Sequence, residues 1–480
     1  MADRPELLVP LASPLIEILP RWVEPLDLLA AAAGRRHRVL LLSGLEGHPA
    51  ARYSILAWDP VRVVRVWEGG AEVVEGGGAP TLMVEAPDPL HLLGDLMPVA
   101  LAGAESLPFL GGGIGYLGYG LRRAIERLPG ALPDPQRQPR AWFGIYDAAL
   151  VFDHDEHRVR VVSTGLGGGS AAARERRAVD RLQQLSQAVA AHSEATAVAM
   201  SGARWPCRGT HRTGREEYLQ RVGRALDYIA AGDIYQVNLS HRIDCPFSAD
   251  PVGLFRGLAN RTPAPFAAFL DTGPLQVLSA SPERFLSLRD NVAVSSPIKG
   301  TRPRGLSPES DARLARELVG SAKERAENIM IVDLVRNDLG RVCETGSVRV
   351  DRLCALESFA TVHHLVSTVS GRLRGDRDRI DLLRALFPGG SMTGAPKIRA
   401  MQIIDELEAE ERGIYSGSIG YLSLDGSMDL NIVIRTIVCG DGTASLRVGG
   451  GIVADSDPEA EFRETLAKGE ALMEVLGAVL

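Results

Sequence analysis

Ser-Ser-Pro-Ile-Lys-Gly-Thr-Arg-Pro-Arg-Gly at residues 295–305 continues an alternating apolar run and carries a single lysine, Lys299. The run predicts a strand that ends near this lysine. A lysine acts as a nucleophile only when part of it is neutral, so its reference pKa of about 10.4 must be lowered by burial or by nearby positive charge. Arg302 and Arg304 could supply that charge. The alternative is a strand that leaves its sheet through a solvated basic loop.

Length and composition favour a large folded chain in a reducing compartment. The 480 residues are 45% hydrophobic, enough for a large core, and the length is typical of about three domains or of one large fold. A net charge of −7 argues against nucleic acid as the main partner. The five cysteines are scattered and form no CxxC pair, which predicts neither disulfides nor structural zinc. Because no signal peptide and no membrane-spanning apolar run is apparent, we expect a cytoplasmic protein without membrane contact.

The secondary-structure pattern favours an α+β fold of antiparallel layers flanked by helices. Consecutive strands are expected at 275–281, 285–288 and 292–299. A three-stranded meander is expected at 417–453, because Asp-Gly turns interrupt apolar runs at 425–426 and 441–442. Helices are expected at 308–319, at 322–338 and from Asp457 onward.

A change of composition divides the chain. Residues 1–165 read as strands and short helices, and 213–480 as helices and strands. Between them, 166–212 begins with a flexible glycine stretch, continues as an alanine-rich and arginine-rich helix, and ends poor in large apolar residues. We therefore predict an N-terminal region, a helical and flexible connection, and a C-terminal region.

A loop at 388–397, Pro-Gly-Gly-Ser-Met-Thr-Gly-Ala-Pro-Lys, precedes a predicted helix and has the shape of a phosphate-binding loop. The G-x-x-x-x-G-K-[ST] spacing is absent, because Pro396 stands where the glycine before the lysine belongs. We reject nucleotide binding for this loop.

Two carboxylates on separate predicted helices are candidates for a hard oxygen site. Glu327 lies in helix 322–338, and Glu464 lies four residues before Lys468 on the last helix. With waters and a substrate carboxylate, two such groups would suit Mg²⁺. The alternatives are an exposed helix glutamate for Glu327 and a solvated i,i+4 ion pair for Glu464 and Lys468.

Further polar residues interrupt predicted strands. His364 follows another histidine on a strand, so at most one of the two faces any cleft, and the pair is a poor zinc signal. Arg435 stands mid-strand, an unusual place for a charge unless it binds an anion. Glycines at 449–451 suggest close approach by a ligand. Glu283 precedes Lys299 by one hairpin and either faces the same cleft or pairs with Arg284.

Taken together, these stretches resemble the chorismate-utilising family, which comprises anthranilate synthase large subunits, aminodeoxychorismate synthase component I, and isochorismate and salicylate synthases. The matching pieces cover nearly all of 213–480 in the expected order: 232–240, 281–285, 297–301, 327–338, His364, 393–397, 417–435, 449–453 and 464–468. The resemblance implies the chorismate-utilising enzyme fold, with a β-sandwich core of large antiparallel sheets. Within the family, Pro-Ile-Lys-Gly-Thr is similar to the aminodeoxychorismate synthase branch, since anthranilate synthases characteristically have alanine at the lysine position.

The resemblance also implies a role for each candidate residue. Lys299 adds to C2 of chorismate, Glu283 is the general acid for the departing C4 hydroxyl, and His364 orients the ring. Glu327 and Glu464 would hold Mg²⁺. Substrate would be bound by Gly300, Thr301, Tyr415, Arg435, Gly449, Gly450, Gly451 and Lys468.

The resemblance implies partners as well. Ammonia would attack C4 to give 4-amino-4-deoxychorismate, a precursor of 4-aminobenzoate and folate. No cysteine stands in a glutaminase-type Gly-x-Cys-x-Gly turn, so ammonia would come from a glutaminase subunit, component II. Related enzymes can hold tryptophan, here near Ser43, Pro263 and Phe266. The competing readings are an anthranilate, isochorismate or salicylate synthase and, from another class, a non-catalytic regulator that binds tryptophan or chorismate.

Overall fold

The structure is a computed structural model that describes residues 8–45, 47–76, 81–97, 99–101, 107–192, 207–359 and 362–479. Two antiparallel sheets, each with twelve strands among these residues, form its framework. The first sheet has the order β1 (Leu15–Ile18), β10 (Arg158–Ser163), β9 (Ala148–Asp153), β3 (Tyr53–Ala57), β2 (Val39–Leu42), β14 (Phe266–Asp271), β15 (Gln276–Ser281), β24 (Thr436–Gly440), β25 (Thr443–Ile452), β13 (Gln236–Pro246) and β12 (Thr210–His211), with β21 (Gly394–Ala395) also paired to β13.

The second sheet carries Lys299 on its first strand. Its order is β18 (Ile298–Pro303), β20 (Val362–Arg372), β17 (Val292–Ser296), β16 (Arg284–Arg289), β23 (Met428–Asn431), β22 (Ser418–Ser423), β7 (Gly112–Leu117), β8 (Ala141–Tyr146), β4 (Arg62–Trp67), β5 (Gly70–Glu75) and β6 (Leu82–Glu85), with β19 (Arg349–Ser358) also paired to β20. A separate parallel pair joins β11 (Cys207–Arg208) to β26 (Ala478–Val479).

The inner faces of the two sheets pack against each other. One cluster of buried apolar side chains combines Val39 and Leu270 of the first sheet with Trp142 and Ile419 of the second. Burial of such side chains is the main favourable contribution to the packing of two sheets. The predicted α+β fold with a β-sandwich core is confirmed.

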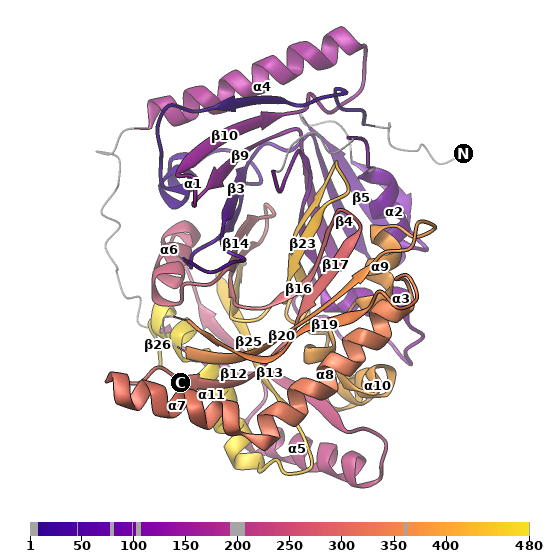
Figure 1. The fold of residues 1–480 in the computed structure, drawn as a ribbon, viewed down its shortest axis with the longest axis vertical. Helices are drawn as coiled ribbons and strands as arrows, with labels where there is room; N and C mark the ends of the chain where they lie inside the picture. The colour runs from indigo at the N-terminus through magenta and orange to yellow at the C-terminus, as the bar shows by residue number, and fades with distance from the viewer. Residues whose placement is uncertain are drawn as a thin grey trace.

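Helices cover the outer faces of both sheets, and one end of the molecule gathers several of them (Figure 1). α4 lies over β10 and β9, whereas α7, α8 and α11 lie near β20 and β25 at the opposite end. The helices are α1 (Pro25–Ala31), α2 (Pro89–Leu96), α3 (Arg122–Ile125), α4 (Ala171–Ala191), α5 (Arg215–Ala230), α6 (Pro251–Arg261), α7 (Pro308–Gly320), α8 (Ala322–Gly340), α9 (Arg379–Leu386), α10 (Lys397–Glu408) and α11 (Pro458–Leu476), with short 3₁₀ turns η1 (Tyr119–Leu121) and η3 (Gly390–Met392). Within the described ranges no helix has the length and apolarity that a membrane span requires.

The N-terminal and C-terminal regions share both sheets. β2 pairs with β14 in the first sheet, and β7 pairs with β22 in the second. The connection contains α4, as expected, and its residues 193–206 lie outside the described residues. The boundary near 165–213 is therefore a boundary along the sequence and does not separate two sheets.

The predicted three-stranded meander at 417–453 is wrong in its middle strand. Both Asp-Gly turns are present, but β22 and β23 pair in the second sheet, whereas β24 and β25 pair in the first. The chain crosses between the sheets at 432–435, where Arg435 adopts a positive φ of 50°. No proline or glycine marks this crossing in the sequence, so an apolar run of ordinary strand length concealed it.

A second crossing lies beside the first. The chain leaves β15 at Ser281, passes Glu283, and enters β16 of the other sheet. The Ile432 amide donates to the Glu283 carbonyl at 3.0 Å, and the Ala280 amide donates to the Arg435 carbonyl at 3.0 Å. These two hydrogen bonds hold the backbone of Glu283 and Arg435 at the junction of the two sheets.

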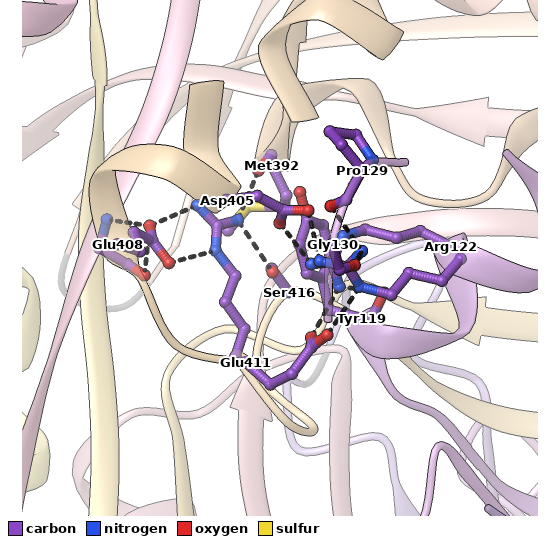
Figure 2. A network of polar contacts seen from close by, with 12 residues as sticks. Tyr119, Arg122, Pro129, Gly130, Met392, Asp405, Glu408, Glu411 and Ser416 are labelled. Carbon is purple, nitrogen blue, oxygen red and sulfur yellow. Dashed lines mark hydrogen bonds and ion pairs between the residues drawn. The ribbon is translucent and has the colours of Figure 1, made fainter. Parts of the chain in front are cut away.

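Buried ion pairs fasten α10 to α3 (Figure 2). Arg122 and Arg123 each contact both Asp405 and Glu411, with nitrogen–oxygen distances of 2.5 to 2.9 Å. All four side chains are at most 10% exposed. Removal of any one of them would leave a buried charge without its partner, which is strongly destabilising.

Arg412 extends this network toward the interior. Its guanidinium bonds both oxygens of Glu408 at 2.7 and 2.9 Å and also donates to the carbonyls of Met392 and Asn238. The ring of Tyr119 lies 4.6 Å from this guanidinium, within cation–π range. One buried arginine thus joins α10, β13 and the loop at 388–397.

Candidate active site

Lys299 lies half-buried on β18, and burial lowers its pKa. The charge of Lys468 lowers the pKa further, against the opposing effects of Glu327, Glu283 and Glu464. A partly neutral amine is what nucleophilic lysine chemistry requires. The alternative of a solvated basic loop is wrong, because β18 continues to Pro303 and pairs with β20.

The two arginines after Lys299 have other partners. Arg302 contacts Glu324 at 3.3 Å, and Arg304 contacts Asp311 at 2.8 Å. Neither is among the largest influences on the pKa of Lys299. The main causes that lower this pKa are burial and the positive charge of Lys468.

Gly300 forms a bulge between Lys299 and Thr301. The pairing with β20 shifts at this point, and Gly300 has a φ of 76°. A Cβ atom here would lie 2.9 Å from Leu318 and 3.1 Å from Glu324, so only glycine fits both the conformation and the space.

His364 is buried opposite this bulge. Its Nδ1 lies 3.0 Å from Thr301 Oγ1 and 3.3 Å from the Gly300 carbonyl, which can only accept. Nδ1 therefore carries the hydrogen, and Nε2, which has no protein partner in the described structure, keeps its lone pair. Burial, reinforced by Arg435, lowers the pKa of His364 to about 3, so the ring is neutral at physiological pH. As predicted, His363 faces elsewhere and contacts Asp311 at 2.9 Å.

Glu283 is a buried carboxyl group with an elevated pKa. Burial raises the pKa to about 7, and Ser391 and Lys299 partly oppose this rise. Ser391 Oγ donates to Glu283 Oε1 at 2.8 Å. The alternative pairing with Arg284 is wrong, because Arg284 contacts Asp429 at 2.8 Å. Glu283 thus has the properties of a general acid near neutral pH.

Glu327 on α8 and Glu464 on α11 both raise the pKa of Lys299 and so oppose the effect of burial. Burial raises the pKa of Glu327, and the negative charge of Glu324 adds to this effect. Burial also acts on Glu464, but its contact with Lys468 at 2.7 Å outweighs burial and leaves its pKa below the usual range. The side chains of Glu464 and Lys468 are 56% and 41% exposed, which places this pair at the mouth of the site.

The carboxylates of Glu327 and Glu464 are the type of ligand that a divalent cation prefers. Mg²⁺ prefers carboxylate oxygens and fills its remaining positions with water and substrate oxygens. A third carboxylate, Glu461, lies close enough to Glu464 that their repulsion raises the pKa of Glu461 in addition to burial. In the part of the chain that the structure describes, no group of three or more His, Cys, Asp or Glu side chains has metal-binding geometry. A cation here would therefore depend on two protein carboxylates and on its substrate.

Gly449, Gly450 and Gly451 of β25 lie next to the side chains of the site. A Cβ on Gly449 would lie 2.9 Å from the Tyr415 hydroxyl oxygen, and one on Gly450 would lie 3.2 Å from Glu461 Oε2. Lys468 Nζ also donates to the Gly449 carbonyl at 3.2 Å. Tyr415 is buried, which raises the pKa of its hydroxyl to about 12 and keeps that hydroxyl protonated. Side chains at these positions would fill the space that the glycines leave.

Arg435 has no carboxylate partner among the described residues. It lines a cavity of about 180 Å³ together with Lys468, and burial lowers its pKa. A partly buried guanidinium without a counter-ion favours binding of an anion, because an unpaired buried charge is costly.

Three residues of the site were missed by sequence reasoning. Gln236 is fully buried, both polar atoms of its amide lack protein partners in the described structure, and a Cβ on Gly451 would lie 2.7 Å from its Nε2. Ser391 contacts Glu283, and Glu461 lies beside Gly450. No sequence signal distinguished Gln236, because polar side chains occur along the whole of β13. Ser391 and Glu461 also had no sequence signal, because only the fold brings them to the site.

A separate cavity of about 450 Å³ lies where the tryptophan site was expected. Ser43 and Phe266 line it, together with Tyr53 and Arg284. Pro263 does not line it, and Pro265 of the same loop does. None of the catalytic candidates is among its lining residues.

Comparisons with known proteins identify the family of this chain. Residues 48–474 match the model of the chorismate binding enzyme family. The chain belongs to this family. It is therefore a chorismate-utilising enzyme with the α+β fold of that family.

Relatives in the chorismate binding enzyme family fall into more than one branch. Aminodeoxychorismate synthase component 1 from Klebsiella aerogenes is 42% identical over 433 residues, which cover 90% of this chain and 91% of the relative. Anthranilate synthase component 1 from Streptomyces coelicolor is 44% identical over 397 residues, 80% of this chain and 77% of the relative. The crystal structure of anthranilate synthase component I from Streptococcus pneumoniae has a TM-score of 0.77 at 34% identity, covering 89% of this chain and 93% of that one.

Proposed function

We propose that the chain is aminodeoxychorismate synthase component I, which converts chorismate and ammonia to 4-amino-4-deoxychorismate. The observation that supports this most directly is the half-buried Lys299 amine beside the raised-pKa carboxyl of Glu283. Relatives from the aminodeoxychorismate and anthranilate branches are similarly close in identity. The branch is therefore argued from the lysine, at a position where anthranilate synthases characteristically have alanine.

In the proposed reaction, the neutral Lys299 amine forms a bond to ring carbon C2 as the two conjugated ring double bonds shift and the C4–oxygen bond breaks. Glu283 gives its proton to the departing oxygen, which leaves as water. Ammonia then attacks C4, the two double bonds shift back, and the C2–nitrogen bond to Lys299 breaks. Glu283 takes a proton from the incoming nitrogen and is restored. The net change exchanges the C4 hydroxyl for an amino group, and two lower barriers replace one.

The remaining residues bind and orient the substrate dianion. Arg435, Lys468 and the Tyr415 hydroxyl supply donors for its carboxylates, and the glycines of β25 leave room for it. His364 offers its Nε2 lone pair beside the ring. Glu327 and Glu464 would hold Mg²⁺, which when bound supplies a counter-charge for the ring carboxylate.

Ammonia requires a source, and we propose a glutaminase subunit as partner. The names of the relatives include "component 1", which implies a second component in those proteins. None of the five cysteines lies in a glutaminase-type turn. The product would enter 4-aminobenzoate and folate synthesis.

An assay with chorismate, Mg²⁺ and ammonium tests the proposal. The expected product is aminodeoxychorismate, identified by mass and by its conversion to 4-aminobenzoate with an added lyase. Anthranilate as main product would transfer the chain to the other amination branch, and isochorismate or salicylate would indicate water as nucleophile. Persistence of chorismate under all conditions would favour the non-catalytic regulator.

We also propose that the 450 Å³ cavity takes tryptophan. Its lining combines the aromatic rings of Tyr53 and Phe266 with the Arg284–Asp429 ion pair, which suits an aromatic amino acid. Denaturation of the purified protein should release tryptophan in stoichiometric amount. Its absence, together with no binding of added tryptophan, would contradict this assignment.

A further inference from the structure

Hydrogen bonds from several elements anchor the loop at 388–397. The Asn238 amide donates to the Thr393 carbonyl at 2.9 Å, and Arg412 donates to the Met392 carbonyl at 2.9 Å. At its end, Lys397 Nζ contacts Asp338 at 2.6 Å and the Leu386 carbonyl at 2.8 Å. Anchors on both sides therefore fix the position of Ser391, the residue at the centre of the loop.

The loop also approaches Glu283 closely. A Cβ on Gly389 would lie 2.6 Å from Ile432, and one on Gly390 would lie 2.5 Å from Leu334, so the two glycines let the loop sit against the sheet crossing and α8. This contact places the buried Ser391 hydroxyl 2.8 Å from Glu283 Oε1. The side chain that the sequence pattern left without a role thus touches the proposed general acid.

Both hydrogen bonds that the Glu283 carboxyl group accepts reach the same oxygen. Oε1 receives the Ser391 hydroxyl at 2.8 Å and the Ile298 amide at 3.4 Å. Within the described structure no donor bonds Oε2. Because donors disfavour a proton on the oxygen that accepts from them, the proton of the neutral acid belongs on Oε2. Lys299 is the charged group that acts on this carboxyl.

We infer that Ser391 is a positioning residue, which holds Oε1 of Glu283 so that Oε2 carries the proton toward the reacting centre. This inference rests on the proposed function for its catalytic meaning, but the hydrogen bond and its effect on the carboxyl exist without substrate. Ser391 stabilises the carboxylate that remains after the proton has left, which makes Glu283 a stronger acid than burial alone would allow.

Infrared titration of the free enzyme tests this step directly. The carbonyl band of protonated Glu283, isolated by subtracting the spectrum of Glu283→Gln, is followed against pH in the wild type, Ser391→Ala, Ser391→Thr and Ser295→Ala. Ser295 is a matched control because its buried hydroxyl donates to the Phe285 carbonyl at 2.7 Å and does not reach Glu283. In Ser391→Ala the midpoint should rise by at least about one pH unit, because a hydrogen bond to a charged group is lost.

The other variants define the specificity of the effect. Ser391→Thr keeps the hydroxyl and should restore the wild-type midpoint, and Ser295→Ala should leave it unchanged. An unchanged midpoint in Ser391→Ala, or an equal rise in Ser295→Ala, would overturn the inference. If Ser391→Ala does not fold, Ser391→Cys provides the weaker donor, and its midpoint should lie above that of the wild type.

Turnover supplies the second readout. In Ser391→Ala, kcat should fall about tenfold with KM for chorismate nearly unchanged. The pH at which kcat/KM declines on the alkaline side should rise by the same amount as the infrared midpoint. A fall in kcat without a rise in that pH would reduce Ser391 to a packing role. If the wild type turns over no chorismate, the proposed function fails while the titration still decides the hydrogen bond.

Discussion

Gly451 and Lys299 face each other so closely that a Cβ atom on Gly451 would lie 3.3 Å from the Lys299 amine. Gly451 belongs to β25 of the first sheet, and Lys299 to β18 of the second. The site therefore has one wall from each sheet, and the glycine sets the space between the walls.

Gly451→Ala should fold but lose turnover. The new methyl would lie 2.7 Å from Gln236 Nε2 and 3.3 Å from Lys299 Nζ, both ends of flexible side chains that can move aside. We expect an unfolding free energy within about 1 kcal/mol of wild type and a fall in kcat of at least about tenfold. Gly223→Ala in α5, where nothing lies within 4 Å, is the control and should keep full activity. Full activity in Gly451→Ala would contradict the placement of substrate on these glycines.

Lys299→Gln should abolish turnover, because it removes the amine but keeps much of the side-chain volume. We expect a loss of at least about a thousandfold in kcat. With the wild type, Mg²⁺ and chorismate but no ammonia, peptide mass spectrometry should find Lys299 carrying chorismate less one water. Arg302→Gln, which removes the contact with Glu324 and a hydrogen bond to the Thr301 carbonyl, should stay within about fivefold of wild type. Normal turnover in Lys299→Gln would exclude the covalent route.

Glu283 should make stability depend on pH. Its pKa is about 7 in the folded protein and 4.5 as an unperturbed group, so the folded state binds the proton more tightly. The contribution of Glu283 to the free energy of unfolding is then complete below about pH 4.5 and is lost as pH rises through about 7, a change of about 3 kcal/mol. Glu283→Gln should remove this dependence, so that urea unfolding finds the variant more stable than wild type at pH 8 but not at pH 4.5. Equal pH dependence in both proteins would contradict the raised pKa.

The Arg412–Glu408 pair should behave as a buried charge pair. Arg412→Met leaves Glu408 buried beside Arg447 at 3.8 Å, which is too far to replace the lost hydrogen bonds. The expected cost is about 3–5 kcal/mol in urea unfolding, and Arg412→Met with Glu408→Gln should recover part of it. Arg313→Met, which breaks an exposed pair with Glu317, should cost less than about 1 kcal/mol. Equal costs for the two single variants would show that burial of Arg412 contributes nothing.

Local sequence patterns predicted the elements well, but they did not predict where strands change sheets. The Asp-Gly turns and the helix starts at Ser307 and Asp457 follow from short-range chemistry. The strand expected at 292–299 is wrong in its bounds, because the structure divides it into β17, which ends at Ser296, and β18, which continues to Pro303. The crossing at 432–435 depends on partners about 150 residues away, such as the Ala280 amide, and these leave no local pattern. Residue patterns made Glu283, Glu327 and Glu464 candidates and the family resemblance supplied their roles, whereas Ser391 and Gln236 became visible only when their polar atoms could be placed in space.

The strand order of the second sheet has a consequence for synthesis of the protein. In the second sheet, β22 joins the N-terminal strands through β7 to the C-terminal strands through β23. A nascent chain therefore cannot complete this sheet until Ser418–Ser423 has left the ribosome. Until then one edge of β7 and one edge of β16 lack their partners β22 and β23, so chaperone protection during translation should matter more for this protein than for one whose strands pair in order of synthesis.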